Sequence, residues 1–258
     1  MGYQCVEYDV TDGVATLSIN RPPMNVLDIP TMREMNLVLD DVRQSQNTLR
    51  VLVITHKGDK AFSTGVDVRD HTPEKMDEMI EVFHGIFRRM VTLDLPTLGV
   101  VNGYALGGGM EVAIFCDLVI ASEKSVFGQP EIKVGVYPSM VVAWLPRIIG
   151  SKKAYEMIFT GDSITAKEAE RIGLINLVAP TEGFQEAVQT FITTRIVVHS
   201  PVVLKWAKKA VLAGCGVDFE KALRNSEIIY KEALMKTHDA VEGLEAFMQK
   251  RQPVWKGA

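Results

Sequence analysis

Two glutamates are the side chains of this sequence that are best suited to acid–base chemistry. Glu111 follows three adjacent glycines in the stretch GGGMEVAIF, and Glu131 follows Gln-Pro in the stretch FGQPEIKV. Taken alone, a glutamate is most often a solvated surface or capping residue. The neighbours of Glu111 are apolar nearly all round, which predicts a buried helix, and a buried carboxyl group needs a partner or a function. Two carboxyl groups beside one pocket can hold different protonation states, so one can take up a proton while the other delivers one.

The glycines at 107–109 lie where an apolar strand gives way to a helix that is predicted from about Gly109 to Cys116. Glycine lets the backbone approach a ligand closely, and the start of a helix presents unpaired N–H groups and a partial positive charge. Such a site suits an oxygen atom that gains negative charge during a reaction. A tight packing turn explains the glycines equally well. A dinucleotide fingerprint is excluded because Val112 stands where the third glycine belongs, and the Gly-Lys-Ser/Thr of a P-loop is absent.

A second glycine lies in another strand-exit loop, in the segment AFSTGVDV at residues 61–68. The backbone N–H of Val66 in this loop is a candidate for the same site. By itself this segment would indicate no more than a turn, and Asp67 fits a turn residue better than a catalytic one.

The elements that must position these residues are short apolar runs alternating with amphipathic stretches. Strands are predicted at Val14–Ile19, Val51–Thr55, Thr97–Val101 and Leu118–Ala121, and helices at Thr31–Val42, Lys75–Val91 and about Gly109–Cys116. This alternation is typical of parallel β-α-β units. The continuous apolar run of Val51–Thr55 favours a sheet that is covered on both faces. Helical spacing places Met32, Met35, Leu39 and Val42 on one face, which predicts a core-facing side.

From Ser200 to Gln249 the sequence is almost entirely helix-forming. Helices are predicted at Leu204–Leu212, Phe219–Met235 and Asp239–Gln249. Pro201 is typical of a helix start, and Asp239 is expected to cap the last helix. The predicted organisation is therefore an α/β core at residues 1–195, which holds the site, and a helical region at residues 196–258.

Composition narrows the class of function. The 258 residues are 47% hydrophobic and carry a net charge of -4, which supports a large core and disfavours nucleic acid as a partner. Neither the three cysteines nor the five histidines have metal-ligand spacing, so no metal is expected. No apolar run is long enough to span a bilayer, and the first residues lack the pattern of a signal peptide, so we expect a cytoplasmic protein without a membrane partner. Ser163 lacks the G-x-S-x-G context of an esterase nucleophile.

Several segments resemble the crotonase (enoyl-CoA hydratase) superfamily over nearly the whole chain. They are AFSTGVDV at 61–68, NGYALGGGMEVAIFCDLVIASEKSVFGQPEIKVGVYP at 102–138, FTGDSITAKEAERIGLINLV at 159–178 and AFMQKRQPVW at 246–255. The resemblance implies a ClpP-like spiral of ββα units with a C-terminal helical region that forms trimers, commonly two stacked as a hexamer. It also implies an acyl-CoA thioester substrate and no cofactor beyond the coenzyme A of that substrate.

The resemblance assigns the reacting groups residue by residue. The N–H groups of Val66 and Gly108 correspond to the oxyanion hole that binds the thioester oxygen. Glu111 and Glu131 correspond to the catalytic pair that holds the attacking water, and having both is specific to the hydratase branch. The implied reaction is addition of water to a conjugated enoyl-CoA or dienoyl-CoA thioester.

The same resemblance assigns five residues to coenzyme A. Thr64 and Val68 correspond to positions whose backbone lines the path of the adenine and pantetheine groups. Arg69 stands where a cation near the phosphates is common. Phe247 and Lys250 match positions near the C-terminus that reach the coenzyme bound by a neighbouring subunit.

A narrower resemblance points to hydratases of cyclohexa-1,5-diene-1-carbonyl-CoA. The segments that carry it are NVLDIPTM, FHGIFRRM, QPEIKVGVYPSMVVAWLPRIIG and LMKTHDAVEGLEAF. After Pro138, ordinary family members carry a glycine-rich run, whereas this chain has the more apolar SMVVAWLP at 139–146. We therefore expect an acyl pocket that includes Tyr137, Met140 and Trp144, although filling a core would explain the two aromatic residues, Tyr137 and Trp144, equally well.

The expected reaction is hydration of cyclohexa-1,5-diene-1-carbonyl-CoA to 6-hydroxycyclohex-1-ene-1-carbonyl-CoA, a step of anaerobic aromatic (benzoyl-CoA) degradation. One alternative is a generic enoyl-CoA hydratase or isomerase of fatty-acid oxidation. Another, from a different class, is a non-catalytic acyl-CoA-binding module on the same scaffold, because a fold alone does not determine function.

Overall fold

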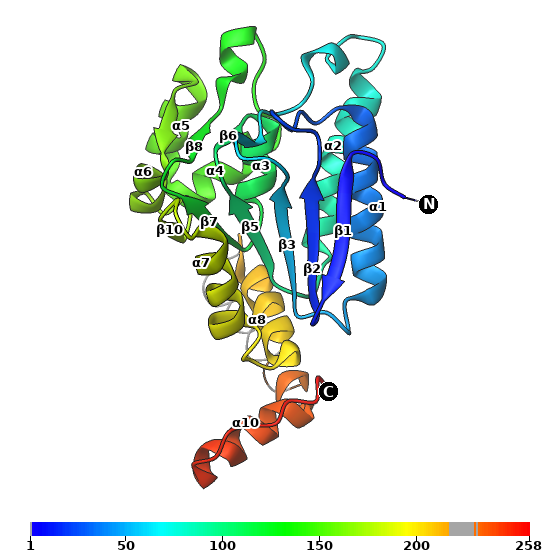
Figure 1. Cartoon of the computed structure of the whole chain (residues 1–258), viewed down its shortest axis with the longest axis vertical. Coiled ribbons are helices and arrows are strands. Elements are labelled where there is room, and N and C mark those ends of the chain that lie inside the picture. The colour runs from blue at the N-terminus through cyan, green and yellow to red at the C-terminus, as the bar shows by residue number, and fades with distance from the viewer. Residues whose placement is uncertain (1, 217–229, 231) are drawn as a thin grey trace.

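A six-stranded sheet forms the centre of the computed structural model, which describes residues 2–216, 230 and 232–258 (Figure 1). Its strands, in spatial order, are β1 (Val6–Thr11), β2 (Val14–Ile19), β3 (Val51–His56), β5 (Thr97–Val101), β7 (Leu118–Ser122) and β10 (Leu177–Ala179). β1 runs antiparallel to β2, and every other neighbouring pair is parallel. The four predicted strands are therefore confirmed, together with their parallel pairing.

Side chains along β3 alternate between two cores, which explains its unbroken apolar sequence. Leu52 and Ile54 join the core that also holds α1, α2 and α3, whereas Val51 and Val53 face α7 on the other side. The four residues at 51–54 are buried on both faces of the sheet and are all apolar, while the partly exposed Thr55 and His56 stand at the end of the strand. The prediction of a doubly covered sheet is confirmed.

A second sheet of four short strands accompanies the first. Its members, in spatial order, are β4 (Ala61–Ser63), β6 (Tyr104–Leu106), β8 (Val126–Gly128) and β9 (Ser163–Thr165). In three consecutive turns the chain passes from the large sheet to the small one, as β3 to β4, β5 to β6 and β7 to β8, and then enters helical structure. At the corner between β5 and β6, Gly103 has φ +107, and a Cβ there would lie 2.2 Å from the Lys60 carbonyl oxygen. Repetition of this turn produces the spiral of ββα units that the resemblance implied.

Two long helices cover one face of the large sheet (Figure 1). They are α1 (Ile29–Ser45) and α2 (Met76–Val91). The Asp28 side chain caps α1 by accepting the Thr31 N–H at 3.0 Å. The four residues predicted to face the core from α1 are fully buried, namely Met32, Met35, Leu39 and Val42. Both helices begin and end within three residues of their predicted bounds.

The other helical segments of the α/β body lie in the connections between the strands and after the last strand. They are η1 (Val68–Asp70), α3 (Gly108–Ile114), η2 (Pro130–Val134), α4 (Val141–Ile149), α5 (Ser151–Thr160), α6 (Ala166–Arg171), α7 (Phe184–Phe191) and a π-helical turn η3 (Ile192–Ile196). The Gly-Gly-Met-Glu start of α3 follows β6 directly, so the second turn of the spiral delivers the glycine cluster and Glu111 together.

The C-terminal region is helical, as predicted. It contains α8 (Pro201–Gly214), η4 (Leu234–Lys236) and α10 (His238–Gln249). Pro201 begins α8, as expected, while most of the predicted helix Phe219–Met235 lies outside the described residues. The Lys208 ammonium group donates to the Leu95 carbonyl oxygen at 3.0 Å and pairs with Asp117 at 2.7 Å, which fixes α8 to the body. The division between residues 195 and 196 stays a prediction.

The expectation that Asp239 caps the last helix is wrong. Asp239 lies inside the first turn of α10 and is fully buried. Its carboxylate accepts the Ser200 hydroxyl at 2.6 Å and the N–H groups of Lys256 and Gly257 at 2.8 and 3.0 Å. The side chain therefore ties the last residues of the chain to the start of α8. The local sequence cannot distinguish a helix cap from a side chain that forms long-range hydrogen bonds, because both place an acidic residue at a helix start.

Within the residues that the structure describes, no single helix is long and apolar enough to cross a membrane. One bent pair, residues 184–196 with residues 201–214, meets that test by length and composition only.

Candidate active site

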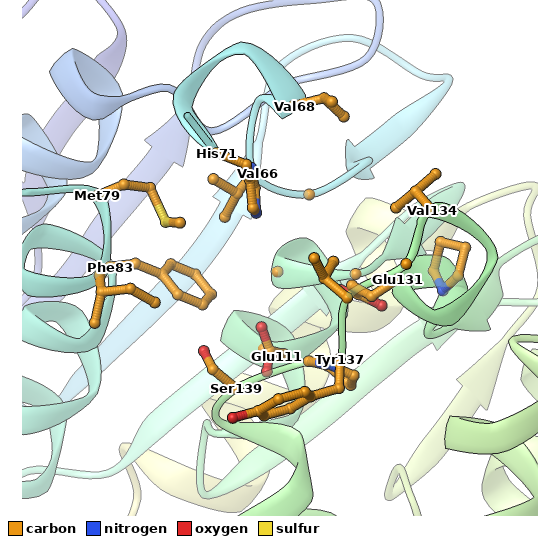
Figure 2. A pocket seen from close by; sticks show the side chains of 18 of the residues that line it. Val66, Val68, His71, Met79, Phe83, Glu111, Glu131, Val134, Tyr137 and Ser139 are labelled. Atoms are coloured by element: carbon orange, nitrogen blue, oxygen red, sulfur yellow. The ribbon is translucent and has the colours of Figure 1, made fainter. Parts of the chain in front are cut away.

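A cavity of about 490 Å³ opens where the three turns of the spiral meet. Its walls are the loop after β4, one side of α2, the glycines that begin α3, and the segment at residues 130–139 (Figure 2). Glu111 and Glu131 both line it, together with Val66 and Gly108. The structure therefore brings together the four residues that the sequence analysis assigned to the reaction, although they are up to 65 positions apart in sequence.

Glu111 lies in the first turn of α3 and is only 2% exposed. Its Oε1 atom accepts two backbone N–H groups, from Met140 at 2.9 Å and from Val141 at 2.8 Å. Burial is the main cause that raises the pKa of Glu111 to about 8, and the negative charge of Glu131 adds to the shift, while the two N–H donors oppose it. A glutamate that keeps its proton near neutral pH can act as an acid or a base there.

Glu131 lies in η2, a short 3₁₀-helix that follows β8. Pro130 begins this helix, as proline often does. Gly107 has φ +53, and a Cβ there would lie 2.6 Å from Glu131 Oε1, so only glycine leaves room for the carboxylate. The fully buried Gln129, with its amide nitrogen toward Glu131, donates to both carboxylate oxygens at 3.0 and 3.2 Å. Burial raises the pKa of Glu131 to about 7.

Two backbone N–H groups face the cavity beside the glutamates. Leu27 pairs with the residues on either side of Val66, donating to the Gly65 oxygen at 2.9 Å and accepting from Asp67 at 3.0 Å, so the Val66 N–H points away from it. Gly108 is the first residue of α3, where an N–H has no partner within the helix. Neither N–H donates to another group within the described part of the chain. A Cβ on Gly108 would lie 2.8 Å from Val66 Cγ2, which shows how closely the two residues approach.

The predicted coenzyme A residues are divided between two places. Thr64 and Val68 line the cavity, and their contact with coenzyme A stays a prediction. Arg69 lies next to its mouth with a side chain that is 82% exposed, and it pairs with Asp67 at 2.5 Å. The Arg69 guanidinium holds the pKa of Asp67 down at about 2. Phe247 lies in α10 and Lys250 directly follows it, and Figure 1 shows α10 at the end of the molecule far from α3, whose first residue lines the cavity. Their contact with the coenzyme of a neighbouring subunit stays a prediction.

The predicted acyl pocket needs a correction. Tyr137 lines the cavity, but Met140 and Trp144 are not among the described residues that do so. Met140 serves the site through its backbone N–H, and its side chain is buried behind the wall. Trp144 packs on Phe115 with ring centroids 4.9 Å apart. The start of α4 turns these two side chains inward because its backbone is held against Glu111.

The apolar wall of the cavity comes instead from α2. Met76, Met79, Ile80 and Phe83 line it, and Figure 2 shows Phe83 and Met79 projecting from α2 toward the two glutamates. This role was not predicted from the sequence, because apolar residues at helical spacing look the same whether they face a core or a ligand. Gln129 and the contact between His84 and Ser139 were not predicted either. The sequence feature that could have indicated a role for Gln129 was its position two residues before Glu131.

A row of aromatic rings supports the wall from behind. Phe83 meets Phe87 with centroids 5.0 Å apart, Phe87 meets Phe115 at 5.1 Å, and Phe115 meets Trp144 at 4.9 Å. The first two contacts are edge-to-face, which is a favoured geometry for aromatic pairs. Trp144 therefore affects the cavity only indirectly, because it packs at the far end of the row of rings that supports Phe83.

The site can perform acid–base chemistry on a substrate whose carbonyl oxygen is bound at the two N–H groups. Two carboxyl groups whose pKa values are both raised toward neutral pH can hold different protonation states there, so one can accept a proton while the other donates. In the described part of the chain, no three His, Cys, Asp or Glu side chains gather as metal ligands would.

This combination of a two-sheet spiral, a carboxyl pair and paired N–H donors defines an acid–base enzyme acting on a carbonyl compound. The family model "Enoyl-CoA hydratase/isomerase" matches residues 9–258, and the chain belongs to this family. The resemblance to the crotonase superfamily is thereby confirmed, as are the spiral fold and the assignment to the acyl-CoA hydratases.

Individual relatives agree with the family. The chain is 36% identical over 250 residues to a short-chain-enoyl-CoA hydratase of Clostridium acetobutylicum, covering 93% of this chain and 92% of the relative. It is 34% identical over 240 residues to a cyclohexa-1,5-dienecarbonyl-CoA hydratase of Thauera aromatica, with the same coverage of each. Among solved structures, an enoyl-CoA hydratase from Bacillus anthracis superposes with a TM-score of 0.92 at 31% identity, covering 99% of this chain and 100% of the other.

Proposed function

We propose that the protein adds water across a conjugated C=C bond of a coenzyme A thioester, with Glu111 and Glu131 as its acid and base. The observation that carries the proposal is the raised pKa of both glutamates in one cavity, directly beside the N–H groups of Val66 and Gly108. A carboxyl pair of this kind is suited to moving two protons within one reaction.

The proposed steps follow from where charge develops. The two N–H groups bind the thioester oxygen, which withdraws electrons from the conjugated C=C bond. One glutamate takes a proton from water as the water oxygen bonds to the electron-poor carbon, and the electron pair of the C=C bond moves toward the thioester oxygen. The other glutamate then gives its proton to carbon, and the thioester carbonyl is restored. One water molecule is consumed and the glutamate pair returns to its starting number of protons.

For the substrate, we propose a compact cyclic dienoyl thioester, cyclohexa-1,5-diene-1-carbonyl-CoA. The aromatic row makes the wall at Phe83 stiff, and a Cβ on Gly108 would lie only 3.0 Å from the Phe83 ring, so this wall stands close to the bound carbonyl group. A ring offers about three more carbons to this wall than a crotonyl group does, at about 0.8 kcal/mol each. Full burial would favour the ring by roughly 2.4 kcal/mol, or about fiftyfold in kcat/KM. A longer linear chain would need space that Phe83 occupies.

The test compares kcat/KM for the cyclic dienoyl thioester, crotonyl-CoA and a ten-carbon linear enoyl-CoA. We expect the order cyclic, then crotonyl, then ten-carbon. A Phe83→Leu variant should improve the ten-carbon substrate relative to the cyclic one, because it removes the ring that closes the wall. Leu37→Ala, at an exposed leucine of α1, serves as the control and should leave all three values unchanged. A strong preference of the wild type for crotonyl-CoA would overturn the ring proposal.

That outcome would support the second candidate, a short-chain linear enoyl-CoA hydratase. The similarity to the Clostridium acetobutylicum short-chain-enoyl-CoA hydratase, at 36% identity, favours it. Both candidates use the same glutamates and N–H groups, so only the acyl preference distinguishes them.

We further propose a trimer or a hexamer of two trimers, located in the cytoplasm. Support comes from the C-terminal region, where Val211 of α8 and Val241 and Leu244 of α10 expose 66%, 44% and 52% of their surface. Exposed apolar side chains gathered in one region are typical of interaction surfaces. Light scattering at micromolar concentration should give the mass of three or six chains, and a monomer would contradict this assembly.

A further inference from the structure

Ser139 places a hydroxyl group on the wall of the cavity, among largely apolar neighbours. Its Oγ atom lies 2.7 Å from His84 Nε2, on α2. The contact joins two walls of the cavity that are 55 positions apart in sequence. Neither residue has a part in the reaction as described so far.

His84 is held in place by its own neighbours. Its ring lies 6.0 Å from the Phe83 ring and 6.5 Å from the Phe87 ring, measured between centroids. Burial, with the nearby charge of Arg88, lowers the pKa of His84, so the imidazole is neutral at pH 7. A neutral imidazole nitrogen either accepts the Ser139 proton or donates its own to Ser139. In both cases the serine oxygen keeps hydrogen-bonding capacity for a ligand, as an acceptor in the first and as a donor in the second.

Ser139 stands directly before a residue that binds one of the two reacting carboxyl groups. Met140, the residue after Ser139, donates its N–H to Glu111 Oε1 at 2.9 Å. Figure 2 shows Ser139 and Glu111 as neighbours on the same side of the cavity, facing Phe83. An oxygen atom that exchanges a proton with Glu111 must be within hydrogen-bond distance of it. An oxygen atom held between Glu111 and Glu131 therefore lies on the side of the cavity where Ser139 is.

We propose that Ser139 binds the hydroxyl oxygen that water addition leaves on the acyl group, and that His84 is the positioning residue that orients Ser139. A ligand hydroxyl both donates and accepts, so it complements the serine in either tautomer of His84. The inference rests on the proposed hydration but not on the cyclic substrate. The proposed contact with Ser139 would allow the site to distinguish hydroxylated acyl-CoA thioesters from those that lack the hydroxyl group.

The test measures dissociation constants for two ligands that differ by that oxygen only, 3-hydroxybutyryl-CoA (each enantiomer separately) and butyryl-CoA. For the enantiomer that the wild type prefers, Ser139→Ala should reduce the ratio of the two affinities about three- to tenfold, which is the usual contribution of one hydrogen bond. Butyryl-CoA should bind as before. His84→Phe, which keeps a ring between Phe83 and Phe87, should shift the ratio in the same direction. Ser151→Ala, at the exposed first residue of α5, is the matched control and should change neither affinity.

The outcomes separate the two ideas. An unchanged ratio in both variants, in a protein that hydrates crotonyl-CoA or the cyclic dienoyl thioester, would overturn the role of Ser139 alone. Equal losses for both ligands would mean that the contact between Ser139 and His84 only supports the fold, and would also overturn it. A wild type that hydrates neither thioester would overturn the proposed function itself.

Discussion

Replacing Glu111 by glutamine should abolish activity and at the same time stabilise the fold. The glutamine Oε1 atom can still accept the N–H groups of Met140 and Val141, so the backbone at the start of α4 keeps its partner. The amide nitrogen that replaces Oε2 neither takes up nor delivers a proton. Loss of one acid–base group should lower kcat/KM by about 10²–10⁴-fold.

The stabilisation follows from the raised pKa of Glu111. This carboxyl group has a pKa of about 8 in the folded protein and an ordinary value of 4.5, so below pH 4.5 it is protonated in both states and ionisation costs no stability. As the pH rises toward 8, the unfolded state releases its proton first, and the folded state loses stability progressively. The variant avoids this loss, which amounts to about 1 kcal/mol at pH 5 and about 4 kcal/mol at pH 8.

Chemical denaturation at pH 5 and pH 8, at one protein concentration, measures this difference. The free energy of unfolding of Glu111→Gln should exceed that of the wild type by an amount that increases with pH. Glu186→Gln, at an exposed glutamate of α7, is the control and should follow the wild type within about 0.5 kcal/mol at both pH values. A stability gain that does not depend on pH would refute the burial argument. Full activity of the variant would refute the acid–base role.

Three further results are expected. In the wild type, kcat/KM should be greatest between about pH 7 and pH 8, where the glutamate pair holds one proton. Glu131→Gln should reduce kcat/KM about 10²–10⁴-fold. The same variant should move the alkaline limb of the pH profile to lower pH, because the charge of Glu131 raises the pKa of Glu111. Gly107→Ala should destabilise the protein by about 1–3 kcal/mol and reduce activity, because its Cβ would lie 2.6 Å from Glu131 Oε1 at φ +53, and wild-type values in denaturation and turnover assays would contradict this. Asp239→Ala should lower the free energy of unfolding by about 1–3 kcal/mol, because it leaves buried hydrogen-bond donors without an acceptor, and an unchanged denaturation midpoint would disprove this role of Asp239.

The larger elements could be predicted because their sequence pattern is long enough to be periodic. The strand at Val14–Ile19 and the strand at Thr97–Val101 were predicted at the bounds that the structure has. The small sheet was not predicted from pattern, because three-residue strands such as Ala61–Ser63 are too short to show alternation. The spiral was expected only from the resemblance, since the pattern itself indicated no more than parallel β-α-β units.

The candidate site could be predicted where a reacting side chain and a backbone N–H donor stand close together in the sequence. Glu111 stands directly after the glycines that present the Gly108 N–H, so one segment of sequence contains both. The acyl wall was not predictable, because it depends on which face of α2 is turned toward the cavity. Trp144 was assigned to the wall from its apolar segment, whereas the hydrogen bonds of the α4 start with Glu111 turn that segment inward.

The spiral has a consequence for how the molecule acquires its function during folding. Val66 follows the first turn of the spiral, Gly108 and Glu111 follow the second, and Glu131 follows the third. No single turn contains a working site, and the cavity exists only when all three are stacked. Parallel strands joined by long connections form slowly, because distant segments must meet before their contacts stabilise them. During refolding, recovery of helical circular dichroism should therefore precede recovery of turnover, because turnover requires all three turns.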